Sequence, residues 1–170
     1  MPDEPMTKER PIVVLASDHA GIGMRKKLRD ELLAGGYEVL DLGPETADPV
    51  DYPDYAEAVA GPVSRGDARF GVLVCGTGIG MSIAANRFPG VRAALLYDEF
   101  AARHARRHND ANVAVFGSRT MRPDAAAHRL KVFLAEPFEG GRHAVRLEKI
   151  RRMENRPGQY VPKGAAGCPS

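Results

Sequence analysis

Five short apolar runs alternate along this chain with longer amphipathic stretches, and this alternation constrains the fold more than any other feature. The runs cover residues 12–16, 37–42, 70–74, 91–96 and 113–116. Helical periodicity and helix-boundary residues predict helices at 22–34, 55–64, 81–86, 98–104, 124–134 and 143–154. Strands that alternate with helices pair in parallel and are covered on both faces. The sequence therefore predicts an α/β fold: a three-layer, doubly wound, Rossmann-like five-stranded parallel sheet.

The predicted elements form a single domain over residues 11–155, which is enough chain to bury a sizeable core. Residues 1–10 are charged and contain proline, and residues 156–170 are rich in Pro, Gly and Ala with few large apolar side chains. This composition predicts a flexible N-terminal extension and a mobile C-terminal tail.

Charge and hydropathy exclude several classes of partner. The net charge of +2 gives no electrostatic reason to expect nucleic acid or an anionic membrane as a partner. No apolar run approaches the length that spans a bilayer. The N-terminus lacks the apolar core of a signal peptide, and Cys75 and Cys168 are poorly placed for a structural disulfide. We therefore expect a cytoplasmic protein with reduced thiols.

A glycine-rich loop over residues 75–80 follows one predicted strand and opens a helix. Gly76, Gly78 and Gly80 alternate in it, so the backbone can approach an anion closely. Met81 stands where a dinucleotide-binding loop needs glycine and where a cysteine phosphatase loop needs arginine, and the Walker Gly-Lys-Ser/Thr is absent. An anion-binding turn and a tight turn without a ligand both fit this spacing.

Cys75 immediately precedes these glycines. A helix N-terminus and loop amides favour the thiolate, which would make Cys75 a competent base or nucleophile. A buried, inert cysteine at the end of a strand is an equally good interpretation of the residue alone.

Other polar segments also come directly after predicted strands, at residues 17–21, 97–98 and 117–119. Ligands of open parallel sheets bind outside the carboxyl ends of the strands, so these segments should share one rim with residue 75. Asp18 and His19 could handle sugar hydroxyls or a phosphate there, although a helix cap and a surface histidine explain the pair if it is taken alone.

Two basic segments lie elsewhere in the sequence. His108 precedes Asn109 and Asp110 at a predicted helix end, and its imidazole could act as an acid or base near neutral pH. Arg142 and Arg146 are spaced i,i+4 in the first turns of the last predicted helix, which suits a phosphate. Taken alone, the second pattern is better explained by ordinary surface arginines at a basic helix start.

Seven motifs occur together in one order. They are Ser-Asp-His-Ala-Gly at 17–21, Asp-Tyr-Pro at 51–53, Cys-Gly-Thr-Gly-Ile-Gly at 75–80, Ser-Ile-Ala-Ala-Asn at 82–86, His-Asn-Asp at 108–110, Phe-Gly-Ser-Arg at 116–119 and Glu-Gly-Gly-Arg-His at 139–143. On these motifs the chain resembles the ribose-5-phosphate isomerase B family, which includes the galactose-6-phosphate isomerase subunits. The resemblance covers about residues 11–155.

This resemblance implies an aldose–ketose isomerase that uses an enediolate and needs no metal or cofactor. It implies that Cys75 is the base, that Thr77 and the loop amides stabilise the enediolate oxygen, and that His108, helped by Asp18, opens the furanose ring. It implies that a phosphorylated sugar is held by His19, Tyr52, Gly76, Gly78, Ile79, Gly80, Asn109, Arg119, Arg142 and Arg146. We find no cluster with metal-ligand spacing, so EDTA should leave activity intact.

One branch of this family lacks the cysteine and uses a glutamate further along the loop. Met81 and Ser82 offer no acid, so the chain resembles the cysteine type. The family also implies a homodimer, or a dimer of dimers, whose shared active site includes the C-terminal helix.

Ribose 5-phosphate and ribulose 5-phosphate are the substrates that the resemblance implies. A tetrose phosphate or a hexose 6-phosphate is the alternative within this class, because pocket shape sets substrate length. A non-catalytic sugar-phosphate sensor on the same fold is an alternative of another class. A cysteine hydrolase is disfavoured, since no motif pairs Cys75 with a histidine.

Overall fold

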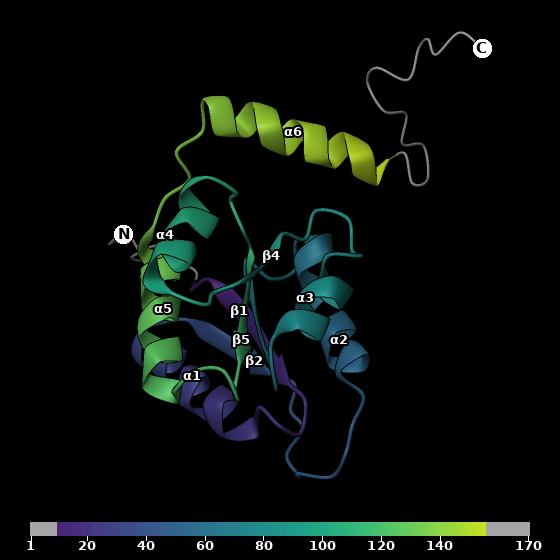
Figure 1. Cartoon of the computed structure of the whole chain (residues 1–170), viewed down its shortest axis with the longest axis vertical. Coiled ribbons are helices and arrows are strands. Elements are labelled where there is room, and N and C mark those ends of the chain that lie inside the picture. The colour runs from purple at the N-terminus through teal and green to yellow at the C-terminus, as the bar shows by residue number, and fades with distance from the viewer. Residues whose placement is uncertain (1–9, 156–170) are drawn as a thin grey trace, which may run out of the picture.

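The computed structural model describes residues 10–155 of the chain (Figure 1). The predicted tail at 156–170, which contains Cys168, lies outside the described residues, as does the predicted extension apart from Arg10.

A single five-stranded parallel sheet forms the centre of the molecule. Its strands are β1 (Ile12–Ser17), β2 (Glu38–Asp41), β3 (Phe70–Cys75), β4 (Ala93–Leu95) and β5 (Val113–Gly117), in the order β2-β1-β3-β5-β4. Every pair of neighbouring strands is parallel. The predicted fold class is confirmed. The strand order reverses between β1 and β3, which is where such sheets open a crevice for ligands.

Helices cover both faces of the sheet. They are α1 (Ile22–Ala34), α2 (Tyr52–Arg65), α3 (Ile79–Ala85), α4 (Glu99–Arg107), α5 (Pro123–Ala135) and α6 (Arg142–Glu154). Helices α1, α4 and α5 lie on one face and α2 and α3 on the other, whereas α6 lies beyond one end of the sheet (Figure 1).

The two cores arise from the alternation of side chains along each strand. Val72 and Val74 point into the core under α1, α4 and α5. Leu73 and Cys75 point into the core under α2 and α3. The runs are apolar throughout because both faces of the sheet are buried.

Element boundaries differ from the expected ones in three places that matter for the site. Helix α2 begins at Tyr52 rather than residue 55, because Pro53 is accommodated in the first helical turn. Helix α3 begins at Ile79, inside the glycine loop. Helix α4 continues past residue 104 to Arg107, so His108 is its C-cap.

No helix within residues 10–155 combines the length and apolar character that a bilayer crossing requires.

Candidate active site

The carboxyl ends of β1 and β3 bring two of the expected site residues to one rim. Cys75 is the last residue of β3, and Asp18 comes directly after β1. The two segments are joined, because the backbone N–H of Asp18 donates to the carbonyl of Val74 at 3.0 Å. Both residues are buried. The expected rim is therefore present, with Cys75 in the crevice.

The glycine loop folds tightly around the thiol. Gly78 adopts φ +79°, a conformation that favours glycine, and its N–H donates to Sγ of Cys75 at 3.1 Å. The N–H of Ile79 donates to Oγ1 of Thr77 at 3.3 Å, and both of these side chains are exposed at the rim. An N–H donor aimed at sulfur stabilises negative charge on it, as a base requires.

Close backbone packing fixes the position of Thr77. A Cβ on Gly117, the last residue of β5, would lie 2.6 Å from the carbonyl oxygen of Thr77. The side chain of the exposed Arg119 lies over Gly76. The backbone N–H of Arg119 donates to the carbonyl of Gly76 at 2.9 Å. Residues 117–119 therefore belong to the same rim, as expected.

Tyr52 and His19 complete this end of the molecule. The ring of Tyr52 packs so closely on Gly80 that a Cβ there would lie 2.6 Å from the ring. Nδ1 of His19 accepts from the N–H of Val50 at 3.2 Å, beside a surface hollow also lined by Asp51 and Tyr55. Tyr52 thus contacts the glycine loop, and His19 contacts the segment that leads into α2.

Asp18 is engaged in local structure. Its Oδ1 accepts from the N–H groups of Ala20 at 2.9 Å and Gly21 at 3.1 Å. This Asx turn fixes the segment that carries His19.

A second cluster contains His108, Glu139 and His143. The two imidazoles are stacked, with centroids 4.1 Å apart and planes 9° apart. Nε2 of each lies 3.6 Å from Oε2 of Glu139, and Nε of Arg107 lies 2.6 Å from the other carboxylate oxygen. The three groups lie within 4.8 Å of one another. The sequence showed no cluster with metal-ligand spacing, because these three residues come together only in the fold.

The electrostatics of this cluster are dominated by positive charge. Burial lowers the pKa of His143, and the charges of His108, Arg142 and Arg146 lower it further. Burial alone would raise the pKa of Glu139, but the hydrogen bond from Arg107 and the surrounding charges bring it below its ordinary value. The basic setting thus disfavours a charge on the imidazole of His143 and favours the ionised carboxylate of Glu139.

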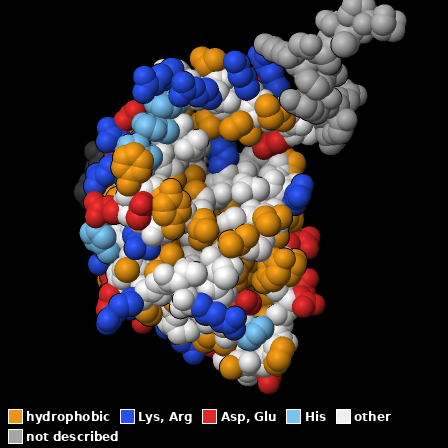
Figure 2. Space-filling view, in the orientation of Figure 1, with side chains coloured by type: hydrophobic (Ala, Val, Ile, Leu, Met, Phe, Trp, Pro, Cys, Tyr) orange, Lys and Arg blue, Asp and Glu red, His pale blue; other side chains and the backbone are white. Residues whose placement is uncertain are grey.

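Arg142, Arg146 and Asn109 are exposed around this second cluster. Figure 2 shows basic side chains gathered along α6, with histidines beside them. The arginines leave their guanidinium groups open to an anion, which is the arrangement expected for phosphate binding.

The two clusters lie at opposite ends of the sheet. In the β3–β5 register, Val113 pairs with Gly71 and Gly117 pairs with Cys75. The start of β5 is thus about 13 Å of strand away from the level of Cys75. His108 lies before that start, and the N–H of Glu139 donates to the carbonyl of Arg107 at 3.0 Å, which places Glu139 at the same end.

This separation decides which of the pairings implied by the resemblance can form within one chain. Within one chain, Asp18 cannot assist His108. Likewise His19 cannot share a phosphate with Arg142 and Arg146. The segments before and after a parallel strand are separated by the full length of that strand, so residues before β5 cannot join the carboxyl rim of their own sheet.

Two supporting residues were missed by the sequence analysis. Glu139 is the first residue of the motif at 139–143, and its i,i+4 spacing to His143 was the available signal. Arg25 is fully buried, donates to the carbonyl of Pro44 at 2.6 Å and pairs with Asp41 at 3.2 Å. It thereby fixes the start of the loop that leads to Tyr52. A charged residue on the apolar face of a predicted helix was the available signal.

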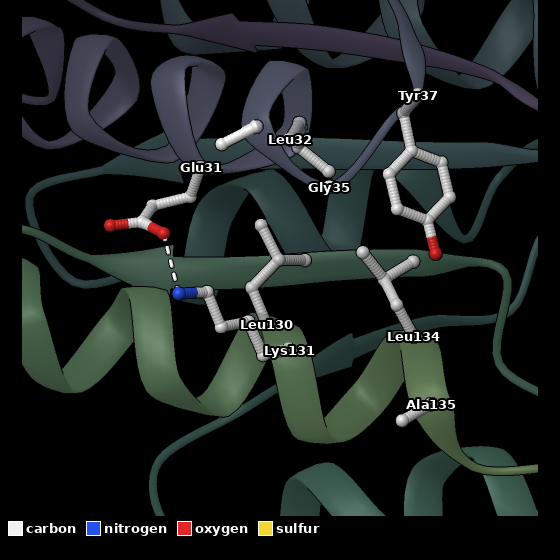
Figure 3. Close-up of a pocket in the computed structure, with 9 residues that line it drawn as sticks. Glu31, Leu32, Gly35, Tyr37, Leu130, Lys131, Leu134 and Ala135 are labelled. Atoms are coloured by element: carbon white, nitrogen blue, oxygen red, sulfur yellow. Dashed lines mark ion pairs between the residues drawn. The ribbon is translucent and has the colours of Figure 1, made fainter.

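A separate hollow of about 340 Å³ lies between α1 and α5 (Figure 3). Leu32, Leu130 and Leu134 give it an apolar wall, and Glu31 pairs with Lys131 at 2.6 Å across it. None of the expected site residues lines it, so it is distinct from both clusters.

Comparisons with known proteins identify the family of the chain. Residues 13–150 match the family model described as Ribose/Galactose Isomerase. Ribose-5-phosphate isomerase B of Escherichia coli is 40% identical over 144 residues, which are 85% of this chain and 97% of that protein.

Solved structures of members of this family are also similar to the chain. Ribose-5-phosphate isomerase B of Mycoplasma genitalium with bound ribulose-5-phosphate has a TM-score of 0.82 at 40% identity, covering 85% of this chain and 97% of that one. Type B ribose 5-phosphate isomerase of Trypanosoma cruzi has a TM-score of 0.84 at 44% identity, covering 86% and 98%. The chain therefore belongs to the ribose/galactose isomerase family, which confirms the family and the isomerase class expected from its motifs.

Proposed function

We propose that this chain interconverts ribose 5-phosphate and ribulose 5-phosphate through a cis-enediolate, with Cys75 as the base. The observation that carries the proposal is the buried thiol that accepts from the N–H of Gly78 at 3.1 Å, at the carboxyl end of β3, where the strand order reverses. The ribulose-5-phosphate in the M. genitalium relative supports the choice of sugar.

The proposed reaction is a proton transfer between adjacent carbons. The Cys75 thiolate takes the proton from C2 of the open-chain aldose, and the C2–H electrons form the C1–C2 double bond as the carbonyl oxygen gains charge. The exposed Thr77 hydroxyl is proposed to donate to that oxygen. Return of the proton from Cys75 to C1, with transfer of the O2 proton to O1, gives the ketose. A base within reach and donors aimed at developing charge are what this step needs.

Substrate binding is divided between the two clusters. At the Cys75 rim, Tyr52 and Arg119, which pack on the glycine loop, and His19 are proposed to contact the sugar phosphate. Arg142 and Arg146 are proposed to hold the phosphate, with Asn109 beside them, and His108 to open the furanose ring. Phosphate binding away from the reacting carbons supplies positioning energy. A phosphorylated metabolite and a reduced thiol suit the cytoplasm, where we place the reaction.

A homodimer resolves the separation of the clusters. We propose that the Cys75 rim of one chain meets the His108 cluster of the other, so each site is shared. Exposed apolar side chains at both ends support this: Ile79, Ile83, Tyr97 and Phe100 near the rim, and Val145, Ile150 and Met153 on α6. Exposed apolar groups in such number mark an interaction surface. Figure 2 shows hydrophobic side chains across the same face as α6.

The test of the proposed function is a comparison of phosphorylated aldoses with four, five and six carbons. We expect the highest kcat/KM for ribose 5-phosphate, with exchange of its C2 proton in deuterated water. A higher kcat/KM for a tetrose phosphate or a hexose 6-phosphate would move the assignment to that sugar. Binding without any exchange at C2 would identify a sensor instead.

His108→Asn should separate ring opening from enediolate formation. General acid–base assistance is worth about 10²–10⁴-fold, so kcat/KM for ribose 5-phosphate should fall by that order. Ribulose 5-phosphate cannot close a furanose ring, because its O5 carries the phosphate. The variant should therefore still exchange the C1 protons of ribulose 5-phosphate at near the wild-type rate, as measured by NMR. Equal losses in both measurements would contradict a ring-opening role.

A further inference from the structure

Three potential metal ligands, His108 from one segment and Glu139 and His143 from a later one, meet at the amino end of the sheet. His108 is the C-cap of α4, Glu139 lies between α5 and α6, and His143 is in the first turn of α6. Nε2 of each histidine lies 3.6 Å from the same oxygen of Glu139. Ligand atoms around a four-coordinate zinc ion with bonds of about 2.0–2.1 Å are roughly 3.4 Å apart. The two distances to Glu139 are therefore already near the spacing that zinc requires, and all three ligand atoms lie within 4.8 Å of one another.

The surroundings hold this arrangement in place. Arg107 binds Oε1 of Glu139 at 2.6 Å and so leaves Oε2 directed at the two imidazoles. The backbone N–H of His143 donates to the carbonyl of Gly140 at 3.0 Å, and the His143 side chain is buried. Outer partners that orient the ligands are typical of metal sites. The rings are now nearly parallel and must tilt for both lone pairs to converge, which the partly exposed His108 permits.

We propose that His108, Glu139 and His143 form an inhibitory site for a divalent transition-metal ion of the zinc type. Two histidines and one carboxylate, with an open fourth position, are a ligand set that zinc accepts. The bound ion occupies Nε2 of His108 and so withdraws this side chain from the sugar. This inhibitory consequence rests on the proposed function, whereas the binding of the ion does not.

The arginines around the cluster favour reversible binding of the metal ion. Arg107, Arg142 and Arg146 surround the cluster and oppose a further cation. The ion is therefore acquired from solution and released again, in contrast to a structural zinc that the fold depends on.

Cobalt(II) binding tests the site without reference to catalysis. Titration of the full, untagged chain with Co²⁺ should give the visible absorption of a low-coordinate cobalt complex. His143→Gln should weaken this binding at least about tenfold. His128→Gln is the matched control, because His128 pairs with Glu99 at 2.9 Å on the surface and no third ligand within residues 10–155 adjoins that pair. Absence of the band, or a band unchanged by His143→Gln, would overturn the site.

Zinc inhibition tests the consequence. Each variant is compared with its own activity without zinc, so a change in basal rate does not affect the comparison. The zinc concentration for half-inhibition should rise at least about tenfold in His143→Gln and stay unchanged in His128→Gln, with full recovery on EDTA. Inhibition that is equally strong in His143→Gln would place the ion on another group, such as the Cys75 thiol, and refute the proposal. If the wild type shows no isomerase activity, the proposed function fails while the cobalt result still decides the site.

Discussion

Cys75→Ala should lose isomerase activity by about 10²–10⁴-fold or more, because the variant has no group to take the C2 proton. Binding of the phosphorylated sugar should persist, since the phosphate contacts are proposed to lie on His19, Arg142 and Arg146. The measurement is kcat for ribose 5-phosphate together with the affinity for the same sugar by calorimetry. Loss of kcat with retained affinity is the signature of an interaction made in the chemical step.

Ser118→Ala provides a matched control for this prediction. Ser118 lies on the same rim, and its hydroxyl donates to the carbonyl of Ala20 at 2.9 Å, but it has no proposed contact with the sugar. We expect it to keep wild-type kcat within a few-fold. Unfolding midpoints of both variants would separate a catalytic loss from a loss of folded protein. Turnover by Cys75→Ala near the wild-type rate would refute the assignment of the base.

The fold could be predicted from the sequence because local and global signals agree. Residues 70–74 are apolar at every position, as a strand buried on both faces must be, and they form β3. Asp98 stands at the start of the helix predicted at 98–104, and its carboxylate caps α4 by accepting from the N–H of Ala101 at 2.6 Å. Such features act over a few residues, so periodicity and capping rules detect them.

The expected rim was also predictable, since it depends only on topology. Residues at the carboxyl ends of parallel strands meet at one edge, so Asp18, Cys75 and Gly117 had to lie near one another. The contact between the Tyr52 ring and Gly80 could not be predicted. It depends on where α2 begins, and Pro53 shifts that start by three residues from the expected position 55.

The second cluster lay beyond sequence reasoning for a different reason. His108 and His143 are brought together by the path of the chain through α5 and by the burial of a single α6 residue, His143. No local pattern encodes that contact. The two histidines lie at the amino end of the sheet, away from Cys75. This separation is the structural argument for the proposed sharing of the site between two chains.

Mixed dimers should show whether the site is shared between chains. Cys75→Ala and His108→Asn chains, co-expressed with different tags, can be purified as pairs that contain one of each. In a shared arrangement one site of the pair combines both lesions, and the other combines the intact Cys75 with the intact His108. The pair should therefore recover about half the wild-type activity, although each variant alone is nearly inactive. The measurement is kcat per dimer for ribose 5-phosphate.

The control is a pair in which both lesions lie on one chain and the partner is wild type. In a shared site each lesion then disables a different site, because the altered chain supplies Cys75 to one site and His108 to the other. That pair should be nearly inactive, whereas sites confined to single chains would leave it half active. The same confinement would leave the first pair inactive, since each of its sites would carry one lesion. The pair that is active if the site is shared is inactive if each site lies within one chain, and the reverse holds for the other pair. The strand length of about 13 Å between Cys75 and the start of β5 favours the shared arrangement.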